Sequence, residues 1–142
     1  MSQESTTPDP VEITRQGWEA ASRGEFGSFG DHLATHAVVD TAGYGMGTFE
    51  GREPALGFMT DWIGSFDDLT MEAEEIVDLG NGVVLTVYHQ NGRPLGGTNY
   101  VRVRSAMVAV WVDGMIVRNT IYTEAEIDEA RAAAKCLAAE RG

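Results

Sequence analysis

The chain has 142 residues, 43% of them apolar, which is enough for one domain with a buried core. It contains 10 Lys and Arg residues against 22 Asp and Glu residues, so its formal net charge at pH 7 is −12. A field of that sign repels phosphate backbones and anionic membranes, which argues against nucleic acid and membrane surfaces as partners.

The sequence also argues against a membrane span and an internal disulfide. No apolar run approaches the roughly 20 residues that cross a bilayer. The start of the chain, MSQESTTPDP, lacks the apolar core of a signal peptide. We expect residues 1–8 to form a disordered polar tail and residues 9–142 a single domain. The one cysteine, Cys136, fits a reducing compartment, so a cytoplasmic protein is expected.

Two helical segments are predicted before the first strand. Apolar residues recur near helical spacing over residues 11–23, and Gly24 can adopt the left-handed conformation that ends a helix. A second, short helical piece is expected within residues 28–36. The β-branched run at residues 37–41 then predicts a short strand.

A glycine-rich stretch leads into the next helix. Its glycines are Gly43, Gly45, Gly47 and Gly51. Pro54 fits the first turn of a helix, where its missing N–H costs nothing. The helix that follows has an apolar face too wide for a surface position. That face consists of Leu56, Phe58, Met59, Trp62, Ile63 and Phe66.

After residue 66 the hydrophobic period changes from near 3.6 residues to near 2, which indicates strands. The predicted strands cover residues 69–79, 83–90, 98–112 and 115–123. Asn-Gly within residues 80–82 and Asp-Gly at residues 113–114 are hairpin turn signals. A second connection is expected at residues 91–97 and a closing helix at residues 124–141. This order predicts an α+β domain with an antiparallel sheet.

The glycine-rich stretch does not fit a phosphate-binding loop. A dinucleotide loop follows a parallel strand within βαβ units, and this chain is built from hairpins. A P-loop needs Lys-Ser or Lys-Thr after its last glycine, whereas Arg52 and Glu53 follow Gly51. The sequence favours a loop that crosses closely over a sheet or the mouth of a pocket.

The segment GTFEGREPALGFMTDW, residues 47–62, resembles the G-x-x-x-G-R-E-A-I-x-x-F segment of SnoaL-like proteins in the nuclear transport factor 2-like superfamily. The resemblance continues through GNGVVLTVYHQNGR, MVAVWVDGMIVRNTIYT and the closing helix, from about residue 9 to residue 137. It implies a cone: a strongly bent antiparallel sheet with helices packed in its concave face and a pocket between them. Many relatives are homodimers. The superfamily includes ketosteroid isomerases, limonene-type epoxide hydrolases, polyketide cyclases and non-catalytic binders, so the fold does not settle the function.

The isomerase mechanism of this superfamily needs a base, a tyrosine and a protonated carboxyl group. By the resemblance, the tyrosine position holds Gly17 and the carboxyl position holds Met107. The base position holds Thr41, with Asp40 one residue earlier. Because a one-residue shift in a strand turns a side chain to the opposite face, Asp40 replaces the base only if the alignment is shifted by one.

The epoxide hydrolases and polyketide cyclases place a carboxyl group in the last strand, where the resemblance puts Asn119. Asn119 can orient a ligand, but its amide cannot accept a proton at useful pH. The strand VVLTVYHQ, which should carry the second acid of an epoxide hydrolase, contains no carboxylate. All three mechanisms therefore lack their central groups.

Three candidate catalytic residues remain: Asp40, Tyr88 and His89. Tyr88 and His89 are neighbours at a strand end, so either side chain can face the pocket, and a histidine can act as acid or base near neutral pH. His32 and His36 are expected at the surface. No cluster of histidine and cysteine residues has metal-ligand spacing, so neither a metal nor another cofactor is expected.

The expected ligand-pocket residues come from the apolar helix faces, the glycine-rich stretch and the later strands. They are Trp18, Tyr44, Met46, Met59, Trp62, Met107, Trp111, Asn119 and Ile121. Tyr44 and Met46 are expected in a lid over the pocket. Strand alternation would place Asn119 on the pocket side together with Val117 and Ile121.

The sequence thus favours a small-molecule-binding protein with an apolar pocket and no recognisable catalytic constellation. An isomerase, cyclase or epoxide hydrolase acting on a small apolar or carbonyl substrate is the alternative, and a non-catalytic interaction domain with a filled core is the second. The strand ending at residue 112 is apolar on both faces. This pattern predicts a homodimer through the outer face of the sheet.

Overall fold

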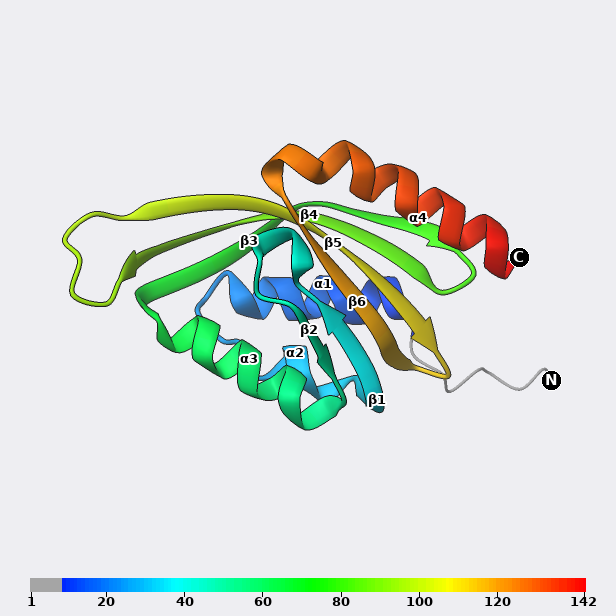
Figure 1. Cartoon of the computed structure of the whole chain (residues 1–142), viewed down its shortest axis with the longest axis horizontal. Helices are drawn as coiled ribbons and strands as arrows, with labels where there is room; N and C mark the ends of the chain where they lie inside the picture. Colours follow the sequence, from blue (N-terminus) through cyan, green and yellow to red (C-terminus); the bar gives the residue numbers. More distant parts are fainter. Residues whose placement is uncertain (1–8) are drawn as a thin grey trace.

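A computed structural model describes residues 9–142 of the chain, so the expected polar tail at residues 1–8 lies outside the described residues. Six strands form one open sheet in the order β2-β1-β6-β5-β4-β3 (Figure 1). The strands are β1 (Leu33–Asp40), β2 (Thr48–Glu50), β3 (Phe66–Gly80), β4 (Val83–Pro94), β5 (Val101–Val112) and β6 (Met115–Thr123). The α+β class predicted from the sequence is confirmed.

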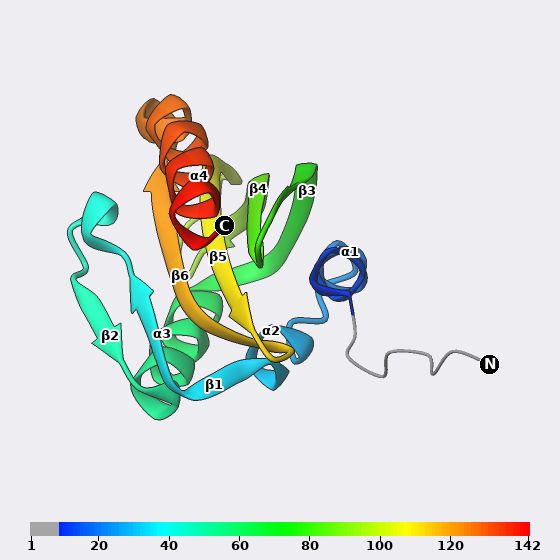
Figure 2. The same ribbon diagram turned by 90° about the vertical axis from the view of Figure 1, so that its right-hand side faces the viewer.

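Helices lie on both faces of this sheet. They are α1 (Pro10–Ala21), α2 (Ser28–Asp31), α3 (Arg52–Gly64) and α4 (Ile127–Arg141), with 3-10 turns η1 (Ala42–Tyr44) and η2 (Glu124–Glu126). The sheet curls so that β1 and β2 lie across from β3, and Figure 2 shows β3, β4 and β5 between α1 and α4. Helix α1 packs along β3 and α3 along β1. These two helices and the curled sheet enclose the interior of the molecule.

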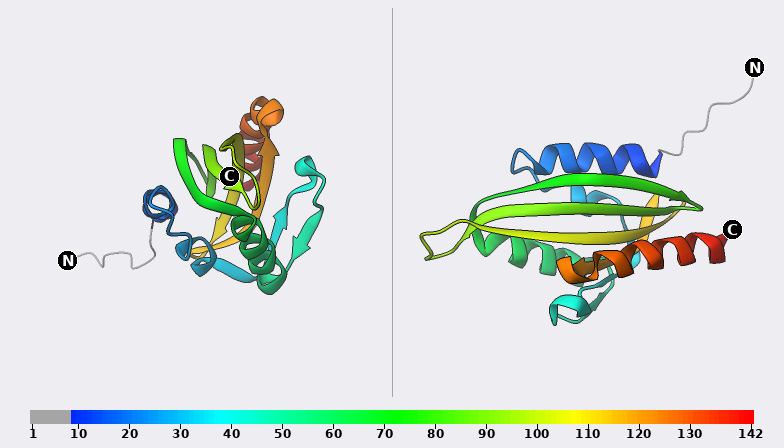
Figure 3. Two further views of the ribbon diagram at one scale, coloured as in Figure 1. Left: turned by 90° about the vertical axis from the view of Figure 1, so that its left-hand side faces the viewer. Right: turned by 90° about the horizontal axis from the view of Figure 1, so that it is seen from above.

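The closing helix α4 lies on the opposite face of the sheet from α1, as the end and top views in Figure 3 also show. The resemblance implied helices packed in the concave face. Helices α1 and α3 lie there, whereas α4 covers a second apolar face of β4 and β5, where Leu85 and Val108 are buried under Ala130 and Ala134. Small alanine side chains let the helix approach the sheet closely, and burial of this apolar area stabilises the contact.

One strand pairing is parallel, which makes the sheet mixed. Strand β1 runs parallel to β6 and antiparallel to β2, while the other pairings are antiparallel. Residues 33–36 belong to β1, so the helical piece expected over residues 28–36 shrinks to α2. The prediction was wrong there because the start of this segment pairs with β6, a strand remote in sequence, with Leu33 opposite Ile116. The Ile116 amide donates to the His32 carbonyl at 2.7 Å, where β6 meets the start of β1.

The two tight turns predicted from Asn-Gly and Asp-Gly are confirmed. Asn81 and Gly82 have φ values of 57° and 82°, and Asp113 and Gly114 have 52° and 80°. Positive φ at both central residues suits a two-residue hairpin, because it matches the twist of the strands. The connection expected at residues 91–97 lies at residues 95–100 instead, because β4 runs on to Pro94 and β5 begins at Val101. The resulting β4–β5 hairpin projects beyond the rest of the sheet (Figure 1).

Candidate functional site

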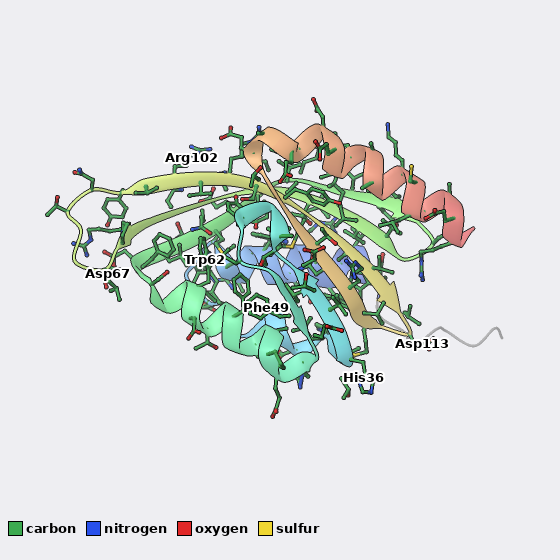
Figure 4. All side chains as sticks on the ribbon, in the orientation of Figure 1. His36, Phe49, Trp62, Asp67, Arg102 and Asp113 are labelled. Atoms are coloured by element: carbon green, nitrogen blue, oxygen red, sulfur yellow. The ribbon has the colours of Figure 1, made fainter. Side chains whose placement is uncertain are left out.

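A cavity of about 140 Å³ lies between the concave face of the sheet and helices α1 and α3. Six aromatic side chains line it: Trp18, Tyr44, Phe58, Trp62, Tyr88 and Trp111. Trp62 projects from α3 toward the sheet (Figure 4). Its ring lies 6.4 Å from the rings of both Tyr44 and Phe58, measured between centroids. The aromatic walls make the cavity largely apolar.

All nine residues predicted for a ligand pocket line this cavity. The sheet brings the strand residues together in rows across its concave face. Asn119 on β6 pairs with Ala109 on β5, which pairs with Val84 on β4. The next row along the strands joins Ile121, Met107 and Thr86. Strand pairing therefore explains why residues far apart in sequence meet at one site.

Strand alternation fails at one position of β6. Val117 was expected beside Asn119 and Ile121, but Ile116 lines the cavity in its place. The reason is an irregularity in the pairing of β5 with β6, where Val110 pairs with Arg118 and Trp111 pairs with Ile116. The extra residue in β6 reverses which side chains face inward before Arg118.

A cluster of three hydroxyl groups lies at one end of the cavity. The Tyr44 hydroxyl is in hydrogen-bond contact with Ser105 Oγ, and Tyr88 is the cross-strand partner of the same serine. Burial raises the pKa of Tyr88 above its ordinary value, and the nearby Tyr44 raises it further, while the neighbouring Ser105 hydroxyl acts in the opposite direction. Tyr88 is therefore a neutral hydroxyl at physiological pH.

Gln90 stands beside this cluster, two residues along β4 from Tyr88 and on the same face of the sheet. The Trp62 Nε1 group donates a hydrogen bond to Gln90 Oε1 at 2.9 Å. Gln90 Nε2 is buried and has no hydrogen-bond partner among residues 9–142. Buried polar atoms are nearly always paired, so an unpaired amide at a cavity wall points to a missing ligand or water.

The other end of the cavity holds His32 and Trp111, whose ring centroids are 5.9 Å apart. Trp111 Nε1 is buried without a partner. Asn119 lies between the two ends, with Nδ2 donating to Met107 Sδ at 3.6 Å and Oδ1 unpaired. Buried polar atoms without a hydrogen-bond partner among the described residues therefore occur at both ends of the cavity and between them.

Of the three candidate catalytic residues, Tyr88 alone lines the cavity. His89 faces the opposite side of the sheet, where Nδ1 lies 3.2 Å from Glu74 and Nε2 lies 3.6 Å from Glu72. Asp40 pairs with Arg118 at 3.2 Å, and its other oxygen caps the η1 turn. Both residues have structural partners outside the cavity.

The glycine-rich stretch forms a loop over the cavity, with Tyr44 and Met46 in its lining. Gly47 O accepts from both the amide and the hydroxyl of Thr41, at 2.8 and 2.7 Å, which closes the loop. Gly45 and Gly47 have φ values of 74° and 83°. Only glycine adopts such angles without strain, so the glycines serve a tight covering loop.

Sequence reasoning missed three polar residues that give this cavity its chemistry: Gln90, Ser105 and His32. Alternation along β4 and β5 would have found the first two, because Gln90 shares a face with Tyr88 and Ser105 shares a face with Met107. His32 was expected at the surface, since its segment was predicted to be helical. No sequence signal placed it at the junction of α2 and β1.

Residues 14–119 match the SnoaL-like domain family. The chain belongs to that family. No curated protein matches it. Among solved structures, the fold resembles a putative SnoaL-like polyketide cyclase from Jannaschia sp. CCS1, with a TM-score of 0.67, 15% identity and coverage of 95% of this chain and 98% of that one.

Two further solved structures contain small molecules. A protein with a ketosteroid isomerase-like fold from Catenulispora acidiphila, in complex with trimethylamine, has a TM-score of 0.67 and 18% identity and covers 82% of this chain and 86% of its own. TerC, co-crystallised with polyporic acid, has a TM-score of 0.65 and 12% identity and covers 85% and 96%. At such identities the likeness shows the fold alone.

The cavity of this SnoaL-like protein offers few groups for proton transfer. Within residues 9–142 no carboxylate lines it, and His32 and the two tyrosines are its titratable side chains. The same residues hold no group of three or more side chains suited to a metal ion, and no helix among them is long and apolar enough to span a bilayer.

Proposed function

We propose that this SnoaL-like protein binds a small, neutral, largely apolar molecule in the cavity between α1, α3 and the sheet. The observation that carries the proposal is the set of buried, unpaired polar atoms in an otherwise aromatic enclosure: Gln90 Nε2, Trp111 Nε1 and Asn119 Oδ1. An apolar cavity with a few convergent polar groups is the usual form of a small-molecule site. The polar atoms would fix the orientation of a ligand, and the aromatic rings would supply its contact area.

The cavity volume limits the size of the ligand. At about 140 Å³ it is close to the roughly 150 Å³ cavity that admits benzene in an engineered protein. A molecule with a single ring or a short chain fits without rearrangement. Solved structures of the same fold with trimethylamine and polyporic acid support a ligand-holding role for such cavities. A ligand as large as polyporic acid would require the covering loop at residues 41–47 to open.

An isomerase- or cyclase-type enzyme is the second candidate, and the Tyr44–Ser105–Tyr88 cluster favours it. Hydroxyl donors of this kind can stabilise a developing oxyanion. Among the described residues no carboxylate base of that chemistry lines the cavity, and His32 is the lining residue with a basic ring nitrogen. Turnover assays with a simple epoxide and an unsaturated ketosteroid test this candidate. We expect no rate above background, and turnover abolished by His32→Gln would establish the enzyme instead.

Ligand binding is tested by thermal shift and calorimetry with a panel of small cyclic molecules. Two matched variants test whether the ligand binds in the cavity. Ala109→Leu adds bulk to the cavity wall, whereas Ala132→Leu adds the same bulk to the exposed side of α4. We expect binding to the wild type and Ala132→Leu and loss of binding in Ala109→Leu. Equal binding by both variants, or no binding to the wild type by any molecule of the panel, would contradict the proposal.

We also propose that the protein forms a homodimer, but through a different surface from the outer face of the sheet. The outer apolar face that suggested it is covered within the chain by α4, which buries Val108. Exposed apolar side chains remain on the projecting β4–β5 hairpin, where Leu95 and Tyr100 are 61% and 63% exposed. Light scattering should give twice the chain mass of 15.3 kDa. The double variant Leu95→Ser, Tyr100→Ser should then return the single mass.

A further inference from the structure

The inner end of the cavity carries hydrogen-bond donors that the chain itself leaves unmatched. The first is the Gln90 amide, whose side chain is 3% exposed. Its orientation is fixed, because the Trp62 indole N–H can only donate and therefore must face Oε1. Gln90 Nε2 is consequently the atom without a partner. The usual ambiguity between the two ends of an amide does not arise here.

The second unmatched donor follows from counting protons in the hydroxyl cluster. Tyr44, Ser105 and Tyr88 each carry one hydroxyl proton. One hydrogen bond joins Tyr44 and Ser105, and Tyr88 lies beside Ser105 as its cross-strand partner. The bond between Tyr44 and Ser105 uses one of the three protons, and a contact of Tyr88 with Ser105 would use one more, so at least one O–H remains to be donated outside the cluster. Tyr88 keeps its proton at neutral pH, because burial raises its pKa.

These donors lie close to one another on the sheet. Gln90 and Tyr88 project from alternate residues of β4 onto one face, and Ser105 is the direct cross-strand partner of Tyr88. Side chains at such positions stand within reach of one small group. A carbonyl oxygen has two lone pairs and no proton, so it can accept from the amide and from the hydroxyl together.

Building on the proposed function, we propose that this end of the cavity holds the carbonyl oxygen of a small neutral ketone, aldehyde or ester, with Gln90 Nε2 and one hydroxyl of the Tyr44–Ser105–Tyr88 cluster as its donors. The aromatic walls then surround the hydrocarbon part of the ligand. Gln90 is the residue that selects for a carbonyl oxygen. Trp62 fixes the orientation of its amide, and Nε2 has no partner among the described residues.

Other ligand chemistries match this end less well. An alcohol carries a hydroxyl proton that needs an acceptor, whereas the unmatched groups at this end of the cavity are donors. A carboxylate would be buried beside no lysine or arginine within the described lining, and a buried unpaired charge is costly. A small ammonium ion would gain from the aromatic rings, but it finds no carboxylate there.

The test compares cyclohexanone, cyclohexanol and methylcyclohexane, which have the same number of heavy atoms and similar shapes. Affinities come from calorimetry at pH 8, with tetramethylammonium as a fourth probe. We expect cyclohexanone to bind about ten-fold more tightly than the alcohol or the hydrocarbon. Infrared spectroscopy of the bound ketone gives an independent readout, because hydrogen bonds lower its carbonyl stretching frequency relative to the ketone in hexane.

Two substitutions of Gln90 test its role. Gln90→Leu and Gln90→Met both remove the amide donor, and Gln90→Met also keeps the length of the side chain. Both should lose most of the ten-fold preference for the ketone and most of the infrared shift, with methylcyclohexane affinity unchanged. Gln16→Met, the same change on the exposed side of α1, is the matched control and should behave as the wild type.

The possible failures can be told apart. Equal affinity for the three cyclohexane derivatives, or an infrared shift that survives both Gln90 variants, would overturn the carbonyl site and leave the binding function standing. Tightest binding of tetramethylammonium would replace the carbonyl site with a cation site. Binding of none of the four probes would count against the proposed function and, with it, against this inference.

Discussion

At the scale of single residues, Asn119 illustrates a conflict between stability and binding. Its amide lies in the cavity with Oδ1 unpaired and Nδ2 directed at the weak acceptor Met107 Sδ. A buried polar atom without a partner costs stability, and proteins tolerate that cost where a ligand supplies the partner. Asn119 therefore belongs to the site rather than to the core.

We predict that Asn119→Leu raises the free energy of unfolding in the absence of ligand by about 1 kcal/mol, because an apolar side chain of similar size removes the unpaired amide. Urea denaturation followed by circular dichroism measures the change. Asn91→Leu on the opposite face of β4, away from the cavity, is the control and should show no gain. A loss of stability in Asn119→Leu would mean that the amide has a partner in solution.

The buried hydroxyl of Tyr88 predicts a pH dependence. Burial raises its pKa in the folded protein, while the unfolded chain should titrate near the ordinary value of about 10. Below that pH the tyrosine is neutral in both states and contributes no pH dependence. Above it the unfolded state ionises first, so stability falls as the pH rises.

We therefore expect the free energy of unfolding of the wild type to decline above about pH 10 more steeply than that of Tyr88→Phe, by up to about 1.4 kcal/mol per pH unit. Denaturation at a series of pH values between 8 and 11 provides the comparison. Absorbance at 295 nm should show that the variant has lost a late-titrating tyrosine. Parallel curves for the two proteins would show that Tyr88 ionises as readily in the folded state.

At the scale of secondary-structure elements, local turn chemistry made the hairpins predictable. Asn81-Gly82 and Asp113-Gly114 adopt the positive φ values that such pairs favour, and these turns fix the ends of β4 and β6. Strand β1 was misread because its start pairs with β6, far along the chain, where Leu33 is the partner of Ile116. Local propensity carries no information about such a partner.

The covering loop depends on a close approach at Gly43. A Cβ added there would lie 2.5 Å from Glu126 Oε1, which is held by the amide and hydroxyl of Thr123 at 3.0 Å each. We predict that Gly43→Ala displaces the loop, lowers the free energy of unfolding by about 1–3 kcal/mol and speeds ligand exchange. Chemical denaturation and stopped-flow tryptophan fluorescence measure the two effects.

Gly57 provides the matched comparison for Gly43. It is exposed in α3, and an added Cβ would meet no atom within 4 Å. Gly57→Ala should raise the free energy of unfolding by about 0.5–1 kcal/mol, because alanine loses less backbone entropy in a helix. If both alanine variants changed stability in the same direction, the close packing of the loop against η2 would be refuted.

At the scale of the whole molecule, the cavity side chains were more predictable than the layers. Helical periodicity and strand alternation are properties of short segments, so they show which residues share a face with Trp62, Met107 or Asn119. Which of the two strand faces lines the cavity follows from the fold. The position of α4 could not be predicted in this way. A strand that is apolar on both faces must bury both, and the sequence pattern is the same whether a second copy of the chain or the chain's own helix buries the outer one.

The packing of α4 on the outer face gives the last prediction. Ala134 is fully buried against β4 and β5, whereas Ala132, two residues away, is exposed. Ala134→Asp would place a carboxylate against the apolar face that includes Val108 and should cost about 3 kcal/mol of stability or more. Ala132→Asp, with the same change in charge and helix propensity, should leave the unfolding midpoint nearly unchanged.

Because α4 and the cavity lie on opposite faces of the sheet, the fraction of the Ala134→Asp variant that remains folded should still bind ligand. Equal stability of the two variants would mean that α4 does not cover this face in solution, and the outer face would then be free for a second copy of the chain.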